Sequence, residues 1–403
     1  MNKNIQHDFD AIVVGSGISG GWAVKELAER GLKTLLLERG PEITHRKDYT
    51  GESKAPWEMS FGGRIPEEET DRDYFIQKQC YALEGPTKKF FVNDRINKYV
   101  YPKNKPFSWI RGYQLGGRSQ LWYRQSYRLS DIDFAANKKD GYGVDWPIRY
   151  QDIAPWYDHV EKFAGISGSR EGLNQLPDGI FLPAMKMNCV ETDAKKKIEQ
   201  AFPSRKMIIG RCAHLTKPTK EHLALGRGQC QNRNECERGC SFGASFSSLS
   251  ATLPAAKRTD NLTIITDAIV HNVLYDNSLK RATGVQIIDA NTKEYRQYNA
   301  RIIFLCASTL GSTQIMLNSK SEDFPNGLAN SSGTLGKYLM DHIFMSGAKG
   351  EHPGYQNKYY SGRRPNGIYI PRYRNITEKD ERFLRGYGYQ GGASRPSWNR
   401  GFT

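Results

Sequence analysis

The sequence predicts an α/β fold that contains parallel strands and a dinucleotide-binding turn. The first observation is a strand–helix–strand unit within residues 10–37, which is the arrangement that connects two parallel strands. The second is the glycine-rich turn Gly15-Ser-Gly17-Ile-Ser-Gly20, which lies between the first strand and the helix. The third is a series of short apolar segments from residue 262 to residue 306, separated by turn residues, which predicts further strands.

Length and composition indicate a globular protein of two or three domains. The chain has 403 residues, of which 38% are hydrophobic and 25% are charged, and a chain of this size can bury a sizeable core. No apolar run approaches the ~20 residues that cross a bilayer, and the polar N-terminus does not resemble a signal peptide. We therefore expect no direct membrane span, and a location in the cytoplasm or, by export with a partner subunit, in the periplasm.

The chain is basic, with 58 Lys and Arg against 43 Asp and Glu, which gives a net charge of +15. Such an excess attracts nucleic acid, anionic lipid or an acidic protein, or simply covers a surface without a specific partner. No basic helix with interleaved aromatic residues is present, so we expect no nucleic-acid partner. An acidic protein partner and a basic surface without a specific partner both remain open.

The remaining elements follow in chain order. A helix is predicted after the glycine turn at 18–30, closed by Gly31, and a second helix at 151–165. Residues 217–245 are predicted to form a polar loop, and no element is predicted between 41 and 110. The expected strands span 10–15, 34–37, 262–266, 269–275, 283–289 and 301–306. Residues 386–403 show no periodicity and no closing strand, so we expect the protein to continue beyond Thr403.

The glycine turn predicts a site for a dinucleotide cofactor. Gly15 allows the tight turn, Gly17 lets the pyrophosphate approach the backbone, and Gly20 lets helix and strand pack closely. Glu38 follows the second strand, where a carboxylate accepts hydrogen bonds from ribose hydroxyls. NAD and FAD both use this geometry, so the turn alone does not distinguish them.

Four motifs in order resemble the glucose-methanol-choline (GMC) family of FAD oxidoreductases. They are Glu38-Arg39-Gly40, Leu115-Gly-Gly-Arg-Ser-Gln-Leu-Trp122, Cys306-Ala-Ser-Thr-Leu-Gly-Ser312 and Leu335-Gly-Lys-Tyr-Leu-Met-Asp-His342. The resemblance covers essentially the whole chain and is greatest to the flavin subunits of bacterial sugar dehydrogenases. Two further segments, 362–367 and 385–390, resemble the glucoside 3-dehydrogenase type.

This resemblance implies a discontinuous Rossmann-like FAD domain and a substrate domain built on an antiparallel sheet. The FAD domain would comprise residues 1–150 and 246–335, with an insertion at 151–245 and the start of the substrate domain at 336–403. Gly116, Gly117 and Ser119 would bring backbone close to the isoalloxazine ring. Val270 and Ala307 would lie near the adenosine. The cofactor-binding residues are thus predicted to be Gly15, Gly17, Gly20, Glu38, Arg39, Gly116, Gly117, Ser119, Val270 and Ala307.

No catalytic residue is predicted. Flavin oxidation of an alcohol needs a base for the hydroxyl proton, a role that suits histidine. The resemblance places a His-Asn or His-His pair beyond the equivalent of Thr403, and it gives the segment around His342 a mainly structural role. We therefore expect residues 1–403 alone to be inactive.

Three cysteines crowd into one short segment, as Cys230, Cys236 and Cys240 with the spacing C-x5-C-x3-C. Three thiolates on one loop suit a 3Fe–4S cluster, and flanking arginines would stabilise them. The resemblance supports this, because glucose-dehydrogenase-type flavin subunits use the same spacing for that cluster. Two alternatives remain open: zinc with His222 as fourth ligand, and a disulfide or inert thiols.

The predicted function is that of an FAD-dependent dehydrogenase subunit acting on a sugar or glycoside hydroxyl, with C3 of a glycoside as the candidate position. Electrons would pass through the cluster to a cytochrome or quinone, and a small subunit and a c-type cytochrome are the expected partners. The alternatives are a dehydrogenase of another sugar or sugar acid, of the gluconate or glucose type, and a non-catalytic flavin-binding protein.

Overall fold

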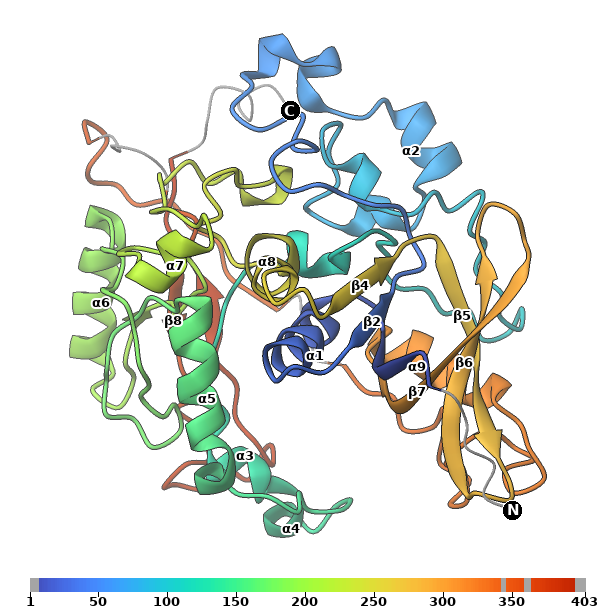
Figure 1. The fold of residues 1–403 in the computed structure, drawn as a ribbon. Coiled ribbons are helices and arrows are strands. Elements are labelled where there is room, and N and C mark those ends of the chain that lie inside the picture. The colour runs from blue at the N-terminus through green and yellow to red at the C-terminus, as the bar shows by residue number, and fades with distance from the viewer. Residues whose placement is uncertain (1–6, 342–345, 359–363, 396–403) are drawn as a thin grey trace. The chain divides into compact units, whose positions relative to one another are not determined.

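The computed structural model describes residues 7–341, 346–358 and 364–395 (Figure 1). The chain divides into two compact units. The first unit comprises Met1–Trp122, Glu235–Gly243 and Ser247–His342, and the second comprises Tyr123–Asn234, Ala244–Phe246 and Ile343–Thr403. These units are structural, and the functional boundaries predicted at residues 150, 245 and 335 remain a prediction. No helix in the described ranges has both the length and the apolar character that spanning a membrane requires.

The first unit is built on a six-stranded sheet with the order β4-β2-β1-β7-β6-β5. Its parallel part consists of β4 (Leu262–Ile265), β2 (Thr34–Leu37), β1 (Phe9–Val14) and the second half of β7 (Tyr295–Leu305). Two of these strands come from the first forty residues and two from beyond residue 260. The predicted discontinuous α/β fold is therefore confirmed.

The antiparallel part of this sheet consists of β5 (Ala268–Asp276), β6 (Arg281–Asp289) and the first half of β7. Residues 295–299 of β7 pair with β6, whereas residues 300–305 pair with β1. The strand predicted at 301–306 thus begins six residues early, at Tyr295. The polar sequence Tyr-Arg-Gln-Tyr-Asn hides this start, because these side chains are mostly exposed.

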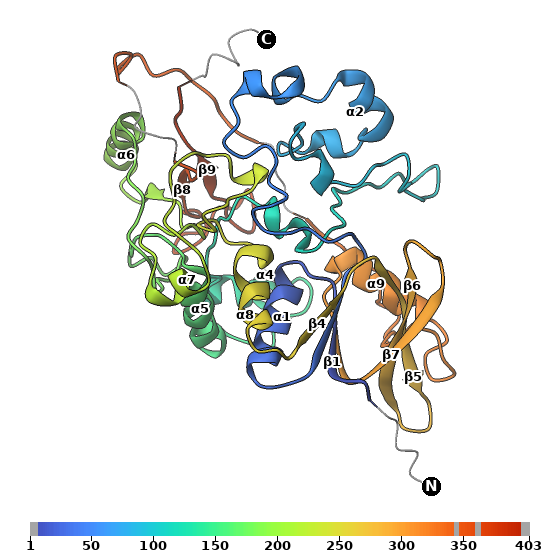
Figure 2. The same cartoon turned by 45° about the horizontal axis from the view of Figure 1, so that its top comes forward.

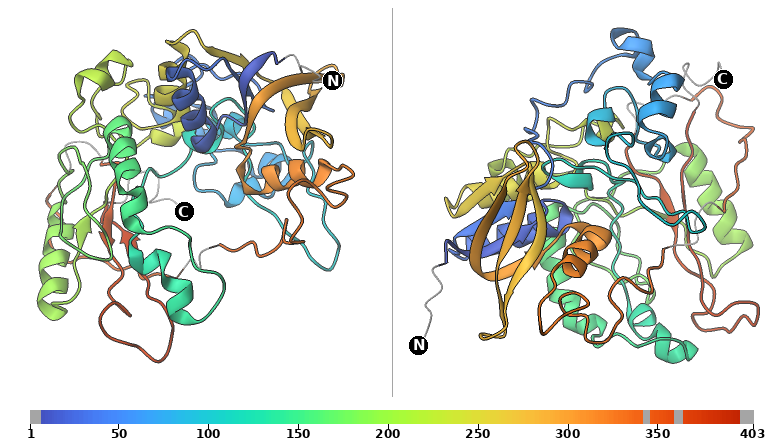
Figure 3. Two further views of the ribbon diagram at one scale, coloured as in Figure 1. Left: turned by 60° about the horizontal axis from the view of Figure 1, so that its bottom comes forward. Right: turned by 90° about the vertical axis from the view of Figure 1, so that its right-hand side faces the viewer.

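Both faces of the parallel strands are covered, because successive side chains of a strand point to opposite faces. Ala11 and Val13 pack in one apolar cluster with α1 (Ile18–Glu29) and α8 (Leu253–Lys257), the two helices labelled beside the sheet in Figure 2. Ile12 and Val14 pack in a second cluster with β5, β6 and α9 (Ser308–Asn318). Figure 3 (right) shows β5 and β6 on that side of the sheet.

The rest of the first unit is largely irregular. It holds α2 (Glu67–Asp73) and a fully buried π-helical turn, η7 (Ser248–Thr252), that leads into α8. Short 3-10 turns lie at Pro56–Glu58, Ser60–Gly63, Gln77–Gln79, Lys88–Phe90, Gly117–Gln120 (η5) and Cys236–Arg238 (η6).

The second unit contains five helices in its described residues: α3 (Asp131–Phe134), α4 (Ala136–Asp140), α5 (Tyr150–Ala164), α6 (Cys189–Ala201) and α7 (Lys220–Ala224). Its strands β3 (Ile208–Ile209), β8 (Ile368–Ile370) and β9 (Tyr389–Gly391) form an antiparallel sheet in the order β3-β8-β9. The helix predicted at 151–165 is confirmed as α5.

The loop predicted at 217–245 is not wholly irregular, which corrects the sequence interpretation. The helix α7 lies inside it, because the Thr219 side chain accepts a hydrogen bond from the His222 N–H at 3.4 Å and so caps its first turn. The turn η6 follows at Cys236–Arg238. A capping threonine thus produced a short helix that the polar composition did not indicate.

Candidate functional site

The predicted cofactor residues lie at the carboxyl ends of β1, β2 and β7, within the first unit. β1 leads into Gly15, β2 leads into Glu38, and β7 leads into Ala307. The neighbours of β1 are β2 on one side and β7 on the other, so the chain connections run in opposite directions from β1. Crevices outside such a switch point bind ligands in open α/β sheets.

Two glycines of the turn are required by the folded backbone itself. Gly15 has φ +92°, and a Cβ built there would lie 2.6 Å from the Cys306 carbonyl oxygen. A Cβ on Gly20 would lie 1.8 Å from the Gly15 carbonyl oxygen. Any side chain at either position would force the turn away from α1 or from the end of β7.

Gly17 is different, because the fold does not require its lack of a side chain. Its φ of −63° suits any residue, and a Cβ built on it would meet nothing within 4 Å. The open space lies at the N-terminus of α1, whose first turn carries no acidic residue. The first four N–H groups of a helix have no partner within it, and with the helix dipole they stabilise phosphate charge. The structure therefore fits a pyrophosphate over Gly17.

The second glycine motif lies directly against this turn. Gly116 and Gly117 have φ values of +87° and +51°, which L side chains rarely adopt. A Cβ built on Gly117 would lie 3.2 Å from the Gly17 Cα. The fold thus brings together the segments predicted to hold the pyrophosphate and the isoalloxazine ring.

Ser16 connects the two motifs to Glu38. Its N–H and its hydroxyl both donate to Glu38 Oε2, at 3.0 and 2.5 Å. The same hydroxyl accepts the Gly116 N–H at 2.8 Å. Ser16 is completely buried. Its place inside the glycine turn was visible in the sequence, but nothing there indicated its hydrogen bond to Gly116.

A second serine, Ser248, fixes the other side of this arrangement. The Ser119 hydroxyl donates to the Gly116 carbonyl at 2.6 Å and accepts the Ser248 N–H at 3.0 Å. The Ser248 hydroxyl donates to the Gly17 carbonyl at 2.9 Å. The π-helical turn η7 therefore ties both glycine segments together. The sequence interpretation missed Ser248, for which only the serine-rich run 245–250 offered a signal.

The Glu38 carboxylate is buried and partly satisfied by the protein. Besides Ser16, the Gly40 N–H donates to Oε1 at 3.1 Å. Burial raises the pKa of Glu38, and the hydrogen bonds from Ser16 and Gly40 oppose that shift only in part. A carboxylate has about four lone-pair sites, so three protein donors leave capacity for a ribose hydroxyl.

The other predicted residues surround this centre. The Ala268 N–H donates to the Glu38 carbonyl at 2.9 Å, which places the start of β5 and hence Val270 beside the end of β2. A bulge follows Val270, where the pairing of β5 with β6 shifts. The Cα of Ala307 would be 3.0 Å from a Cβ on Gly15. The Arg39 guanidinium stacks on the Tyr113 ring, 3.7 Å from its centroid. That Val270, Ala307 and Arg39 contact a cofactor remains a prediction.

The cysteines do not form a comparable centre. Cys236 and Cys240 belong to the first unit, whereas Cys230 belongs to the second. Within residues 7–341, 346–358 and 364–395, no group of three or more His, Cys, Asp or Glu side chains is arranged to hold a metal ion. The described residues therefore give the three-thiolate site no support, and the 3Fe–4S cluster remains a sequence-based hypothesis.

The zinc alternative finds no support either. Both ring nitrogens of His222, its supposed fourth ligand, have hydrogen-bond partners: Nδ1 lies 3.1 Å from the Thr219 N, and Nε2 lies 3.1 Å from the Phe163 carbonyl. These bonds hold the end of α5 and explain why His222 is buried. His342 and residues 362–363 of the glucoside 3-dehydrogenase-like motif lie outside the described residues.

Comparison with known proteins places the chain in a family. The family model described as "GMC oxidoreductase" matches residues 9–344. That match covers both glycine motifs, Glu38 and all six strands of the first unit, and it supports FAD as the cofactor. The resemblance inferred from the sequence is thereby confirmed at the level of the family.

Three characterised proteins are similar over most of the chain. The 2-methyl-1,2-propanediol dehydrogenase of Mycolicibacterium austroafricanum is 26% identical, over 94% of this chain and 63% of its own length. The fructose dehydrogenase large subunit of Gluconobacter japonicus is 22% identical, over 83% of this chain and 58% of its own length. The gluconate 2-dehydrogenase flavoprotein of Pantoea cypripedii is 24% identical, over 77% of this chain and 52% of its own length. The chain thus spans between half and two thirds of the length of these relatives.

Proposed function

The chain belongs to the GMC oxidoreductase family, and we propose that it forms the FAD-binding part of a dehydrogenase that oxidises a hydroxyl group of a sugar or glycoside. The observation that carries the proposal is the close approach of Gly117 to Gly17, within a serine network that also holds Glu38. Glycine segments that meet in this way leave backbone that a flat ring system and its phosphates can approach closely.

In this proposal, each part of the site has one binding task. The N-terminus of α1 over Gly17 stabilises the pyrophosphate, and Glu38 accepts a ribose hydroxyl. Val270 and Ala307 border the adenosine, while Gly116 and Gly117 allow the isoalloxazine to lie against the backbone. FAD supplies hydride acceptance from an alcohol carbon, and the chain's own residues hold it in one orientation.

The sugar substrate is supported by two relatives, which are named for fructose and for gluconate. Oxidation at C3 of a glycoside rests on the motifs at 362–367 and 385–390 alone. A second candidate is a small branched diol, which the 2-methyl-1,2-propanediol dehydrogenase favours. The two candidates differ in the size and polarity of the group beside the reacting carbon, so a substrate panel separates them.

We also propose that a separate protein or quinone takes the electrons from the flavin, since two relatives are named as dehydrogenases and one of them as a large subunit. A cytochrome docking on the basic surface is the specific form of this proposal. The 3Fe–4S hypothesis is tested by iron analysis of anaerobically purified protein, which should give about three irons per chain. An iron content near zero would remove the cluster from the account without affecting the FAD site.

The test of the proposed function uses the natural gene product, purified with its flavin. Anaerobic addition of glucosides, glucose, gluconate, fructose and 2-methyl-1,2-propanediol is followed by the visible absorbance of the bound flavin. We expect bleaching by a glycoside or sugar at concentrations that leave the diol without effect. Bleaching by the diol alone would select the second candidate, and no bleaching by any alcohol would contradict both.

A further inference from the structure

The segment that carries two of the three clustered cysteines is anchored to the first unit at several points. We call Glu235–Gly243 the cysteine loop. The Ser241 N–H donates to Glu52 Oε1 at 2.8 Å, and Arg46 Nε donates to the Ser241 carbonyl at 2.9 Å. Arg238 donates to Glu84 Oε2 at 2.9 Å. The loop is therefore tied to residues that follow β2, on the chain segment that leads away from Glu38.

Tyr49 lies under the middle of the cysteine loop. A Cβ built on Gly239 would lie 2.2 Å from Tyr49 Cγ and within 2.6 Å of both Cδ atoms. The ring thus packs directly on the Gly239 backbone, which is possible only because Gly239 lacks a side chain and has φ +112°. Tyr49 is buried, so its ring holds the Gly239 backbone in a fixed position against the rest of the first unit.

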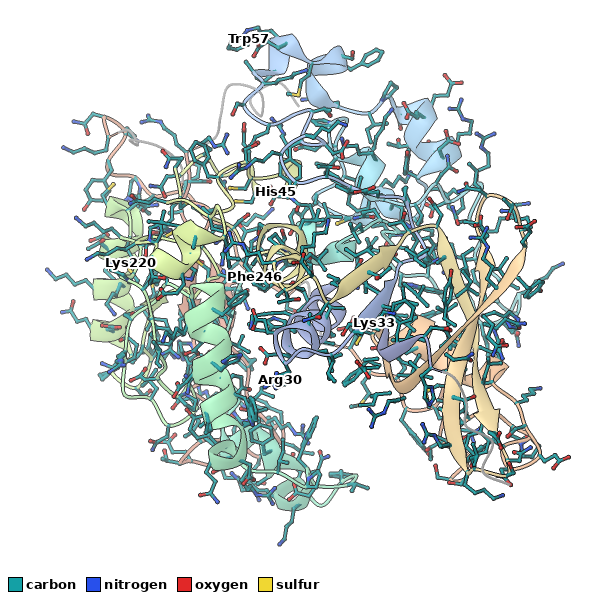
Figure 4. All side chains as sticks on the ribbon, viewed as in Figure 1. Arg30, Lys33, His45, Trp57, Lys220 and Phe246 are labelled. Atoms are coloured by element: carbon teal, nitrogen blue, oxygen red, sulfur yellow. The ribbon has the colours of Figure 1, made fainter. Side chains whose placement is uncertain are left out.

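The hydroxyl of the same tyrosine reaches the predicted flavin segment. It donates to Gln120 Oε1 at 3.2 Å, and Gln120 is the last residue of η5, the turn that begins at Gly117. His45 Nδ1 lies 2.9 Å from the Tyr49 hydroxyl oxygen. Because the hydroxyl proton is donated to Gln120, the His45 tautomer that donates from Nδ1–H to this oxygen completes the arrangement. Figure 4 labels His45 in this part of the first unit.

We propose that Tyr49 is a positioning residue that couples the cysteine loop to the glycine segment Gly116–Gln120. FAD binding at the glycine segment then also orders the cysteine loop. The proposal rests on the proposed function, because it takes Gly116 and Gly117 to contact FAD. It goes beyond that function in assigning a specific link between the site and the loop. It needs no metal, since the contacts involved are the Tyr49 ring and one hydrogen bond.

The size of the effect follows from the hydrogen bond between the Tyr49 hydroxyl and Gln120 Oε1, which Tyr49→Phe removes. A neutral hydrogen bond changes an equilibrium constant by about two- to tenfold. Linkage is reciprocal: the factor by which bound FAD stabilises the ordered cysteine loop equals the factor by which the ordered loop tightens FAD binding. Amide hydrogen exchange reports such local opening, and the loop offers protected amides in Ser241, Gly239 and Gly243.

The experiment compares exchange with and without bound FAD in three proteins: the wild type, Tyr49→Phe and Tyr99→Phe. Tyr49→Phe keeps the ring on Gly239 and removes the hydroxyl. Tyr99→Phe is the matched control, because it removes a hydroxyl in the same unit that bonds Gln77 and the Trp109 carbonyl instead. Peptides covering 115–121 and 235–243 are followed by mass spectrometry.

We expect FAD to slow exchange about two- to tenfold in both peptides of the wild type and of Tyr99→Phe. In Tyr49→Phe, FAD should still slow 115–121 but no longer 235–243. A general loss of stability would instead speed exchange equally with and without FAD. The coupling alone would be overturned if FAD still slowed exchange of peptide 235–243 in Tyr49→Phe. It would also be overturned if FAD slowed exchange of 115–121 but not of 235–243 in the wild type. No response of 115–121 in the wild type would show that the proposed FAD site is wrong, and the coupling with it.

Discussion

Gly117 lies against Gly17, close enough that a Cβ on Gly117 would be 3.2 Å from the Gly17 Cα. The two residues belong to motifs far apart in the sequence; Gly17 directly precedes α1, and Gly117 is the first residue of η5. Their contact forms one continuous glycine surface at the carboxyl end of β1.

Substitution of the turn glycines should separate cofactor binding from folding. Gly17→Ala adds a methyl group to open space at an ordinary φ, so the melting temperature of the FAD-free protein should hardly change. FAD affinity should fall at least tenfold, or about 1.4 kcal/mol, because the methyl occupies the proposed pyrophosphate position. Flavin content and thermal unfolding measure the two effects.

Gly20→Ala is the control for that substitution, because its Cβ would lie 1.8 Å from the Gly15 carbonyl oxygen. Overpacking of this kind costs about 1–3 kcal/mol of stability, so this variant should unfold at a lower temperature even without FAD. Wild-type FAD affinity in Gly17→Ala would contradict the placement of the pyrophosphate.

Glu38→Ala should weaken FAD binding by about 1–3 kcal/mol, the usual loss when a hydrogen bond to a charged group is removed. The Ser16 hydroxyl and N–H would lose their acceptor as well. Titration of FAD into the cofactor-free variant measures the change. Unchanged affinity in this variant would show that Glu38 serves only to hold Ser16.

The FAD-free protein should lose stability as the pH rises through the raised pKa of Glu38. Burial makes the charged carboxylate unfavourable, so the pKa lies above the ordinary value of 4.5. An acid with a raised folded pKa contributes stability below its unfolded pKa, and that contribution disappears as the group ionises. Denaturant unfolding of wild type and Glu38→Gln over this pH range should show the loss in wild type only. Parallel curves would contradict the shift.

His214 should make the second unit sensitive to acid. Burial, with the charges of Arg124 and Arg227, lowers its pKa from 6.5 to about 3. A base with a lowered folded pKa contributes stability above its unfolded pKa and loses it as the pH falls. Between 6.5 and about pH 5 the loss should be about 2 kcal/mol. His214→Gln should flatten this dependence, and an equally steep decline in the variant would place its origin elsewhere.

Local patterns in the sequence sufficed for much of the fold. Apolar runs and the glycine turn predicted β1, α1 and β2 to within one residue, because strand and helix periodicities are local properties. The sequence did not predict the polar start of β7, because it depends on pairing with β6. It did not predict α7 either, because that helix depends on the single cap by Thr219.

The candidate site was predictable residue by residue but not as an arrangement. The glycine motifs and Glu38 were visible in the sequence. The bonds from Ser16 to Gly116 and from Ser248 to Gly17 were not, because they join segments that meet only through the fold. The cysteine spacing predicted a metal centre, yet the residues described here contain no such group.

The most direct test of the central claim is the identity of the cofactor. The purified protein is denatured, and the released small molecules are examined by absorbance and mass spectrometry. The account predicts about one FAD per chain, with a lower flavin content in Gly17→Ala and an unchanged content in Tyr49→Phe. A correctly folded protein that releases no flavin, or that releases NAD instead, would contradict the assignment of the glycine surface to FAD.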